Sequence, residues 1–242
     1  MYLKAKDWQR YVDRLAAINT YAARQMTAYI NKYGVEDTIQ LITYAFGVTS
    51  KYGAAATALT AEMYDRIAEL QKANVPAAVP AALPTYSDVA ATVNGTLKTT
   101  HNSDAVGSSV ARLVKQSSAD TMLQNAVRDG AWFAWIPSGD GCAFCEMIAS
   151  NGWKKAGKKT LNGTHAEHIH PNCRCEYAVR FNDSLDVEGY DPDAIYDKIN
   201  SMEGDTWNEK VNALRREEYA KNKDEINEQK REAYAKRQEA GE

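Results

Sequence analysis

The sequence predicts a mainly α-helical protein with an N-terminal antiparallel helical bundle, a small α+β module and a long charged C-terminal helix. Three observations support this fold class. Apolar residues recur every three to four positions through most of the chain before residue 130. Alanine is abundant, whereas glycine and proline are sparse at 14 and 6 of 242 residues, a composition that favours helices. The stretch 130–182 departs from the helical pattern and contains all four cysteines.

The first 73 residues predict the bundle. Between Asp7 and Lys32 the apolar side chains follow helical spacing, and Gly34 is typical of a helix stop. The pattern repeats in Val35–Tyr52 and again in the alanine-rich Gly53–Lys72. Three helices with short connections form an antiparallel bundle.

The middle of the chain predicts a linker followed by further helices. Residues 74–86 contain three prolines in the run N-V-P-A-A-V-P-A-A-L-P-T, which favours an extended, semi-rigid linker. In the helical segment 87–129, Ser87-Asp88 and Ser103-Asp104 are typical helix caps before two apolar-periodic runs.

The cysteines and a histidine form a predicted metal site. Cys142 and Cys145 make a Cys-x-x-Cys pair that follows Ser-Gly-Asp-Gly, a run that permits a tight backbone turn. Downstream, His170-Pro-Asn-Cys173-Arg-Cys175 supplies three more donors. Five good donors therefore converge on a site that needs four for tetrahedral zinc, so one is spare or lies outside the coordination sphere.

The donor set indicates a structural rather than a catalytic zinc. Cys142, Cys145 and Cys175 with either His170 or Cys173 would close the coordination sphere, which leaves no open position for substrate or activated water. Apolar segments at 131–136 and 176–181 flank the two ligand pairs and predict short strands. We therefore expect a zinc-stapled α+β module over residues 130–182.

The cysteines have two alternative interpretations, two disulfides or a redox-active pair. The N-terminal residues lack the apolar core of a signal peptide, so we expect a reducing compartment, which disfavours two disulfides. A thioredoxin-like redox pair requires a βαβ setting without a second cysteine pair. His165 and His168 are interpreted as solvated loop residues; the alternative for His168 is that it replaces His170 as a ligand.

The remaining segment, residues 183–242, predicts an acidic turn, a short helix over Asp193–Asn200 and a charged helical tail from Thr206. Arg216-Glu-Glu-Tyr-Ala-Lys-Asn and Arg231-Glu-Ala-Tyr-Ala-Lys-Arg are near-copies within this tail. Its apolar positions are too thin to bury a strong seam, so we expect a long, exposed helix.

Net charge and hydropathy restrict the function classes. The formal net charge of −3 gives no general attraction to nucleic acid. No apolar run approaches the length of a membrane span, so we expect no membrane partner.

The order of these elements resembles a known family. Several helices, an aromatic strand, C-A-F-C-E-M-I-A-S-N-G-W and then H-P-N-C-R-C before a short strand resemble the MuF-like minor capsid, or head morphogenesis, proteins of tailed bacteriophages. The resemblance is strongest over residues 131–181; before that stretch only the general order of elements matches, and the tail after residue 182 has no counterpart.

The resemblance implies a minor capsid protein that assists procapsid assembly next to the portal. It implies the portal protein or the major capsid protein as partner, and it leaves open a contact with packaged DNA and entry into the host with that DNA. It implies a place inside the phage head, and the host cytoplasm during assembly. The motif residues that it carries over are Cys142, Cys145, His170, Cys173 and Cys175. Some members of the family carry an additional enzymatic domain. The sequence here has no nucleophile elbow, phosphate loop or zinc-protease helix, so we expect no enzyme and no small-molecule substrate.

An enzymatic alternative is a zinc-stapled nuclease of the HNH type. His165 or His168 would then be the general base, and the lysines of the insert would contact phosphate. Such a site needs a further metal-binding His or Asn on a helix after the hairpin, whereas Asn172 lies inside the cysteine motif. A third reading is a DNA-binding adaptor without catalysis, supported only by Lys154, Lys155, Lys158 and Lys159.

Overall fold

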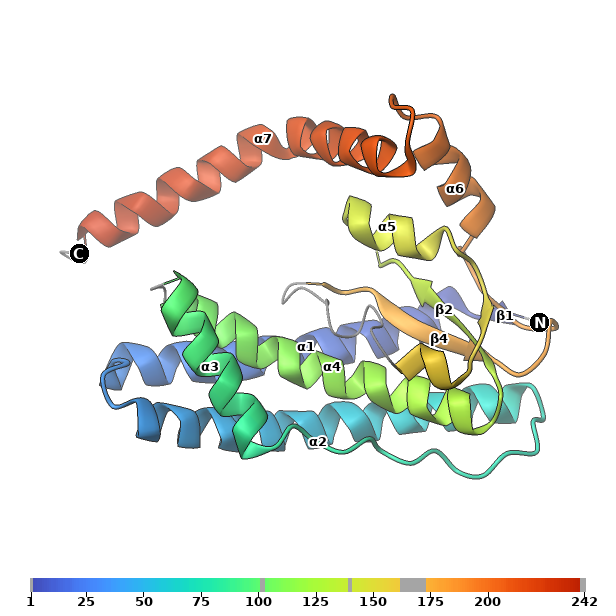
Figure 1. The fold of residues 1–242 in the computed structure, drawn as a ribbon, viewed down its shortest axis with the longest axis horizontal. Helices are drawn as coiled ribbons and strands as arrows, with labels where there is room; N and C mark the ends of the chain where they lie inside the picture. Colours follow the sequence, from blue (N-terminus) through green and yellow to red (C-terminus); the bar gives the residue numbers. More distant parts are fainter. Residues whose placement is uncertain (1, 101–102, 139–140, 162–172, 240–242) are drawn as a thin grey trace. The chain divides into compact units, whose positions relative to one another are not determined.

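The computed structural model describes residues 2–100, 103–138, 141–161 and 173–239 (Figure 1). The chain forms two compact units. Unit 1 comprises residues 1–139 and 153–190, and unit 2 comprises residues 140–152 and 191–242. The domain boundaries expected after residues 73, 86, 129 and 182 stay predictions.

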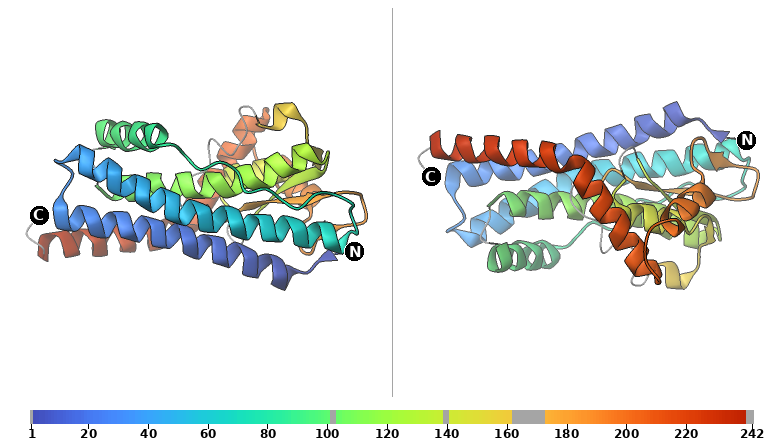
Figure 2. Two further views of the ribbon diagram at one scale, coloured as in Figure 1. Left: turned by 90° about the horizontal axis from the view of Figure 1, so that it is seen from below. Right: turned by 90° about the horizontal axis from the view of Figure 1, so that it is seen from above.

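Unit 1 is built on three long helices. They are α1 (Ala5–Tyr33), α2 (Thr38–Leu70) and α4 (Ser103–Arg128), and the shorter α3 (Tyr86–Thr100) packs on α2 and α4. The two views of Figure 2 show the long helices side by side. The mainly helical fold class is thereby confirmed.

The third helix of the bundle is not the one that the sequence predicts. The predicted break between residues 52 and 53 is wrong, because α2 continues through Gly53 as a single helix. The third long helix is α4, which lies antiparallel to α1 but runs in the same direction as α2 (Figure 1). From the end of α2 the chain returns along the bundle through the extended residues 73–85 to α3, which precedes α4.

Gly34 ends α1 as predicted, whereas Gly53 and Gly107 mark close contacts within the bundle. A Cβ atom on Gly53 would lie 3.0 Å from a methyl carbon of Leu83. A Cβ on Gly107 would lie 3.0 Å from Thr27 Oγ1 and 3.1 Å from the carbonyl oxygen of Ala23. The absence of a side chain therefore lets α4 approach the backbone of α1 and lets α2 approach the returning segment.

Side chains of α2 and α4 bind the backbone of the proline-rich segment. Asn125 accepts a hydrogen bond from Val79 N at 2.9 Å and donates to Val79 O at 2.8 Å. Thr121 Oγ1 accepts from Ala81 N at 3.0 Å, and Arg128 donates to the carbonyl oxygens of Pro76 and Ala77. These bonds satisfy polar groups of a segment that forms no helix or strand.

The small sheet of unit 1 has the order β3-β2-β4. Strands β2 (Trp132–Ile136) and β4 (Glu176–Arg180) are antiparallel and fulfil the two strand predictions; their register pairs Trp132 with Arg180 and Ile136 with Glu176. The edge strand β3 (Lys154–Lys155) precedes the 3₁₀ helix η1 (Lys158–Leu161). A second, parallel pair joins β1 (Tyr2–Leu3) to β5 (Asp186–Val187).

Unit 2 contains α5 (Ala143–Ala149), α6 (Pro192–Asn200) and α7 (Trp207–Glu239). The predicted short helix corresponds to α6, where the Asp191 carboxylate accepts hydrogen bonds from two backbone amides and Pro192 occupies the first turn. The predicted charged helix corresponds to α7. Its first turns are not simply exposed, because Val211 and Leu214 are buried in one core with Ala143 and Ile199.

Candidate metal centre

Two of the predicted ligands lie in unit 1, directly before β4. Cys173 and Cys175 are buried, with exposed fractions of 5% and 2%. Glu176, the residue after Cys175, begins β4 and pairs with Ile136 at the end of β2. The Cys-x-Cys segment is therefore followed directly by a residue whose position in the sheet is fixed by strand pairing.

The other cysteine pair begins α5 of unit 2. Cys142 is the N-cap residue in an extended conformation, and its carbonyl oxygen accepts the first helical hydrogen bond from Glu146 N at 3.0 Å. Cys145 follows in the first turn and is fully buried, whereas Cys142 is half-buried. Helix α5 is held within unit 2 by the Glu146–Lys198 ion pair and by a hydrogen bond from Ala143 N to Glu218.

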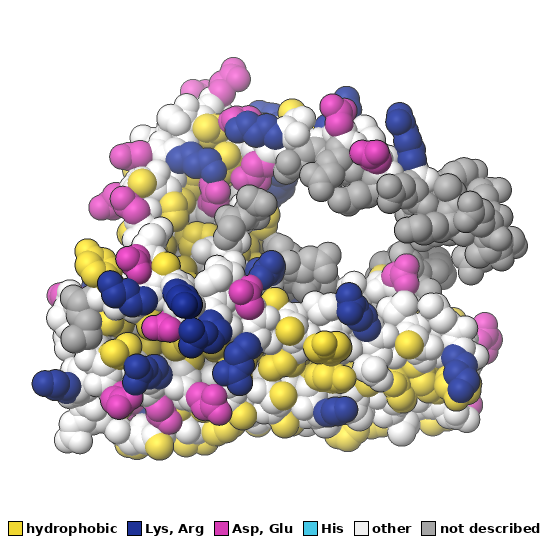
Figure 3. Space-filling view, turned by 180° about the vertical axis from the view of Figure 1, so that it is seen from behind, with side chains coloured by type: hydrophobic (Ala, Val, Ile, Leu, Met, Phe, Trp, Pro, Cys, Tyr) yellow, Lys and Arg dark blue, Asp and Glu magenta, His cyan; other side chains and the backbone are white. Residues whose placement is uncertain are grey.

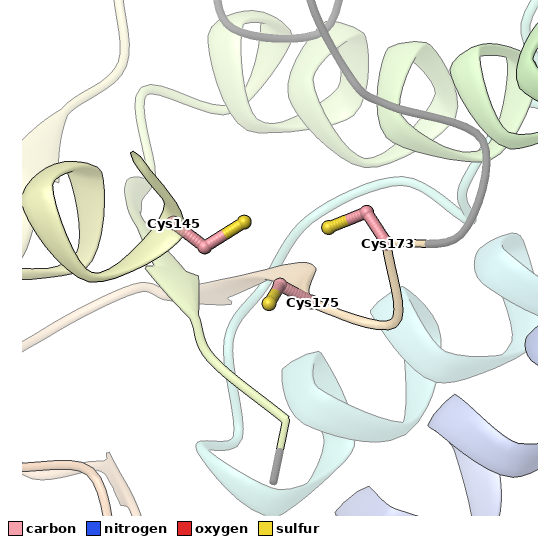
Figure 4. Close-up of side chains that lie close together, drawn as sticks. All are labelled: Cys145, Cys173 and Cys175. Carbon is pink, nitrogen blue, oxygen red and sulfur yellow. The ribbon is translucent and has the colours of Figure 1, made fainter. Parts of the chain in front are cut away.

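Three of the five predicted ligands come together. The sulfur atoms of Cys145, Cys173 and Cys175 all lie within 4.8 Å of one another. Figure 4 shows the Cys145 and Cys173 side chains pointing toward each other, with Cys175 beside them. Cys142 does not belong to this group, and His170 lies outside the described residues, as do His165 and His168.

The chemistry of this donor set fits a zinc ion. Zn–S bonds of about 2.3 Å in a tetrahedron place sulfurs about 3.8 Å apart, which is compatible with three sulfurs that all lie within 4.8 Å of one another. None of the four cysteines, all of which are described, forms a disulfide. Three buried cysteines close together can therefore hold a metal ion, for which Cys142 and His170 are the predicted candidates to supply a fourth ligand.

A buried ion pair anchors the loop that carries Cys175. Lys115, from the middle of α4, donates from Nζ to the carbonyl oxygen of Cys175 at 2.9 Å and to the carboxylate of Glu176. The Lys115 and Glu176 side chains are only 1% and 3% exposed. Burial raises the pKa of Glu176 to about 7, and the attraction of the Lys115 ammonium opposes that rise.

Sequence reasoning missed this ion pair. The available signal was a single lysine within the apolar run of α4, which includes Val110, Leu113 and Val114, and a glutamate at the first position of an apolar strand. Neither residue stands out by itself, because lysine and glutamate are usually exposed. Two opposite charges at positions where the pattern predicts burial, however, indicate that they pair with each other.

The lysines on which the DNA-binding interpretation depends lie at and next to an edge strand of the small sheet. Lys154 and Lys155 form the exposed edge strand β3, and Lys158 and Lys159 follow in η1. Lysine on an edge strand commonly prevents pairing with other chains. On the face shown in Figure 3, Lys and Arg side chains are interspersed with Asp and Glu.

Comparison with known proteins identifies a family. No curated protein and no solved structure matches the chain. Among the described helices, none combines the length and apolar character that crossing a membrane requires. One family model, described as VG15 protein, matches residues 2–202 and so covers all of unit 1 together with α5 and α6. The chain belongs to the VG15 protein family, a phage-related family of viral gene products.

Proposed function

We propose that this chain is a non-enzymatic minor capsid protein of a tailed bacteriophage, of the MuF-like type, that acts in head assembly next to the portal. It would lie inside the head, after assembly in the host cytoplasm. The observation that carries this proposal is the group of three buried cysteines in a chain of a phage-related family.

The burial of the cysteines supports a structural metal. Cys145, Cys173 and Cys175 are 0%, 5% and 2% exposed, so a substrate or an attacking water would have little access to an ion that they held. Zinc bound in this way contributes folding free energy and links chain segments that are distant in sequence. The proposed ligands are these three residues with His170 or Cys142 as the fourth.

An exposed apolar surface supports a protein partner. At the turn between α1 and α2, Ile39 and Tyr33 have exposed fractions of 76% and 60%. Contiguous exposed apolar patches typically mark interaction sites, and these two side chains, six residues apart in sequence, are the ones that the proposal uses. We assign this turn to the contact with the portal protein; the major capsid protein is the alternative partner.

Incorporation into heads tests the role and the surface. Heads are assembled in host cells that express the phage structural genes with wild-type chain, Ile39→Ser or Val79→Ser, and copies per head are measured by quantitative mass spectrometry. Val79 is a matched control because it is 62% exposed but lies in the segment that packs on α4. Loss of one buried aliphatic contact is expected to lower incorporation of Ile39→Ser about tenfold, with little change for Val79→Ser.

Either part of this proposal can fail separately. Heads that lack the wild-type chain would contradict the capsid role. Equal incorporation of Ile39→Ser and wild type would contradict only the assigned surface. Heads assembled without portal that still take up the chain would identify the major capsid protein as its partner.

The nuclease and the DNA-binding adaptor are not favoured as functions. The histidines that a nuclease would need, His165 and His168, lie outside the described residues. The family match gives no support to either alternative.

A further inference from the structure

We propose that Lys115 is a positioning residue for the metal centre, which holds the backbone of Cys175 in its ligand conformation before metal arrives. The inference rests on the proposed zinc site and adds a residue on a different element, α4. Lys115 does not contact the metal in this proposal; it acts through the carbonyl oxygen of Cys175 and the carboxylate of Glu176.

The geometry holds the peptide group on the carboxyl side of Cys175. Its carbonyl oxygen accepts the hydrogen bond from Lys115 Nζ at 2.9 Å, and the next residue, Glu176, is held in the sheet opposite Ile136. With this peptide plane held, the direction of the Cys175 side chain depends on two torsion angles of that residue, ψ and χ1. The anchor therefore determines where the Cys175 sulfur can lie.

Stability alone does not explain the ion pair. Both side chains are almost fully buried, and the desolvation of two charges often exceeds their mutual attraction. A pair of apolar residues of the same volume would fill the space between α4 and β4 equally well. The charged lysine adds something that an apolar residue lacks, a directed hydrogen bond to one particular carbonyl oxygen.

Buried groups of α1 and α2 lie near the Lys115–Glu176 pair. Burial raises the pKa of the Tyr11 phenol, to which the nearby Glu176 charge also contributes, and the Tyr11 hydroxyl is hydrogen-bonded to Thr60 Oγ1 at 3.1 Å. Tyr11 from α1 and Thr60 from α2 are both buried. The anchor thus belongs to the rigid interior of unit 1, which is the arrangement that preorganises a ligand.

Three variants isolate the contribution of Lys115. Glu176→Gln keeps an oxygen acceptor for Lys115 and the hydrogen bond to Cys175, but it removes the charge that pairs with the buried ammonium. Lys115→Met with Glu176→Gln removes that hydrogen bond without leaving an unpaired buried charge. Tyr64→Phe is the control for loss of a remote buried hydrogen bond, the one to Asp129 at 2.8 Å.

The measurement is titration of the metal-free, reduced full-length chain with Co²⁺, followed by its thiolate-to-cobalt charge-transfer absorption, and then displacement by Zn²⁺. We expect the double variant to bind zinc about 10- to 100-fold more weakly than Glu176→Gln, with an altered cobalt spectrum. Tyr64→Phe should retain wild-type affinity and spectrum.

The outcomes separate this inference from the zinc proposal. Wild-type chain without cobalt or zinc uptake would overturn both. Tight binding by wild type together with equal affinity in the double variant would overturn only the positioning role. If the double variant does not fold without metal while Glu176→Gln does, the pair serves folding, and the positioning role is wrong.

Discussion

The carboxylate of Asp129, at the end of α4, shows how single side chains fix unit 1. It accepts two hydrogen bonds from Arg128, each at 2.7 Å, and one from the Tyr64 hydroxyl at 2.8 Å. Burial raises the pKa of Asp129, but the hydrogen bonds from Arg128 and Tyr64 outweigh that effect and hold the pKa below its ordinary value. The same Arg128 also binds the proline-rich segment, so this carboxylate orders three parts of the unit.

The depressed pKa of Asp129 predicts a loss of stability in acid. In the unfolded chain this carboxyl titrates near about 3.9, and in the folded chain it titrates lower. Its contribution is therefore fully present above pH ~4 and is lost as the pH falls through the folded pKa. We expect Asp129→Asn to lower the free energy of unfolding by about 1–3 kcal/mol at pH 7, measured by urea denaturation, and by much less at pH 3.

A surface aspartate provides the comparison. Asp183 also pairs with an arginine, Arg180, but its side chain is 82% exposed, so Asp183→Asn should change the free energy of unfolding by less than about 0.5 kcal/mol. A deficit of Asp129→Asn that stays the same from pH 7 to pH 3 would show that the charge of Asp129 does not stabilise the fold.

At the scale of the elements, the periodicity of apolar residues predicts most helices and strands, but it predicts one helix boundary wrongly. The sequence alone predicts a joint at Gly53, since glycine interrupts many helices. Its actual role depends on Leu83, thirty residues later, which packs where a Cβ atom would lie. Local sequence cannot reveal such a contact, because it arises only when the returning segment passes α2.

The candidate site was predictable to the extent that its chemistry is local. The Cys-x-x-Cys and His-Pro-x-Cys-x-Cys motifs identified the donors by residue type and spacing alone. The grouping of Cys145 with Cys173 and Cys175, but without Cys142, depends on how α5 begins: Cys142 caps the helix and Cys145 lies in its first turn. The Lys115 anchor required knowledge that α4 faces β4.

Glycine substitutions test the close approach of α1 and α4. In Gly107→Ala the new methyl group would lie 3.1 Å from the backbone oxygen of Ala23, which cannot move aside as a side chain can. In Gly47→Ala, within α2, no atom lies within 4 Å of the new Cβ. Both gain helix propensity, so the difference between them isolates packing.

We expect Gly47→Ala to raise the free energy of unfolding by up to about 1 kcal/mol. The free energy of unfolding of Gly107→Ala should be about 1–3 kcal/mol lower than that of Gly47→Ala, because overpacking forces the helices apart. Thermal unfolding followed by circular dichroism measures both. Equal stabilisation by the two substitutions would mean that α1 and α4 do not need the glycine contact.

For the whole molecule, the metal ligands matter because of where they lie in the chain. Cys145 belongs to unit 2, whereas Cys173 and Cys175 belong to unit 1. Each unit has its own buried residues: the helical core in unit 1, and a small cluster around Ile199, Val211 and Leu214 in unit 2. An ion bound by all three cysteines would link chain positions that lie about thirty residues apart in the sequence.

The measurement that tests this account most directly is the zinc content of the purified chain by elemental mass spectrometry, with thiols counted before and after chelation. The account predicts about one zinc per chain and cysteine thiols that react only once a chelator or denaturant is added. Cys175→Ser should lose most of the zinc, whereas Ser150→Ala, which lies at the far end of α5, should retain it. A wild-type chain that carries no metal, with its cysteines joined in disulfides or readily reactive without chelator, would contradict the central claim.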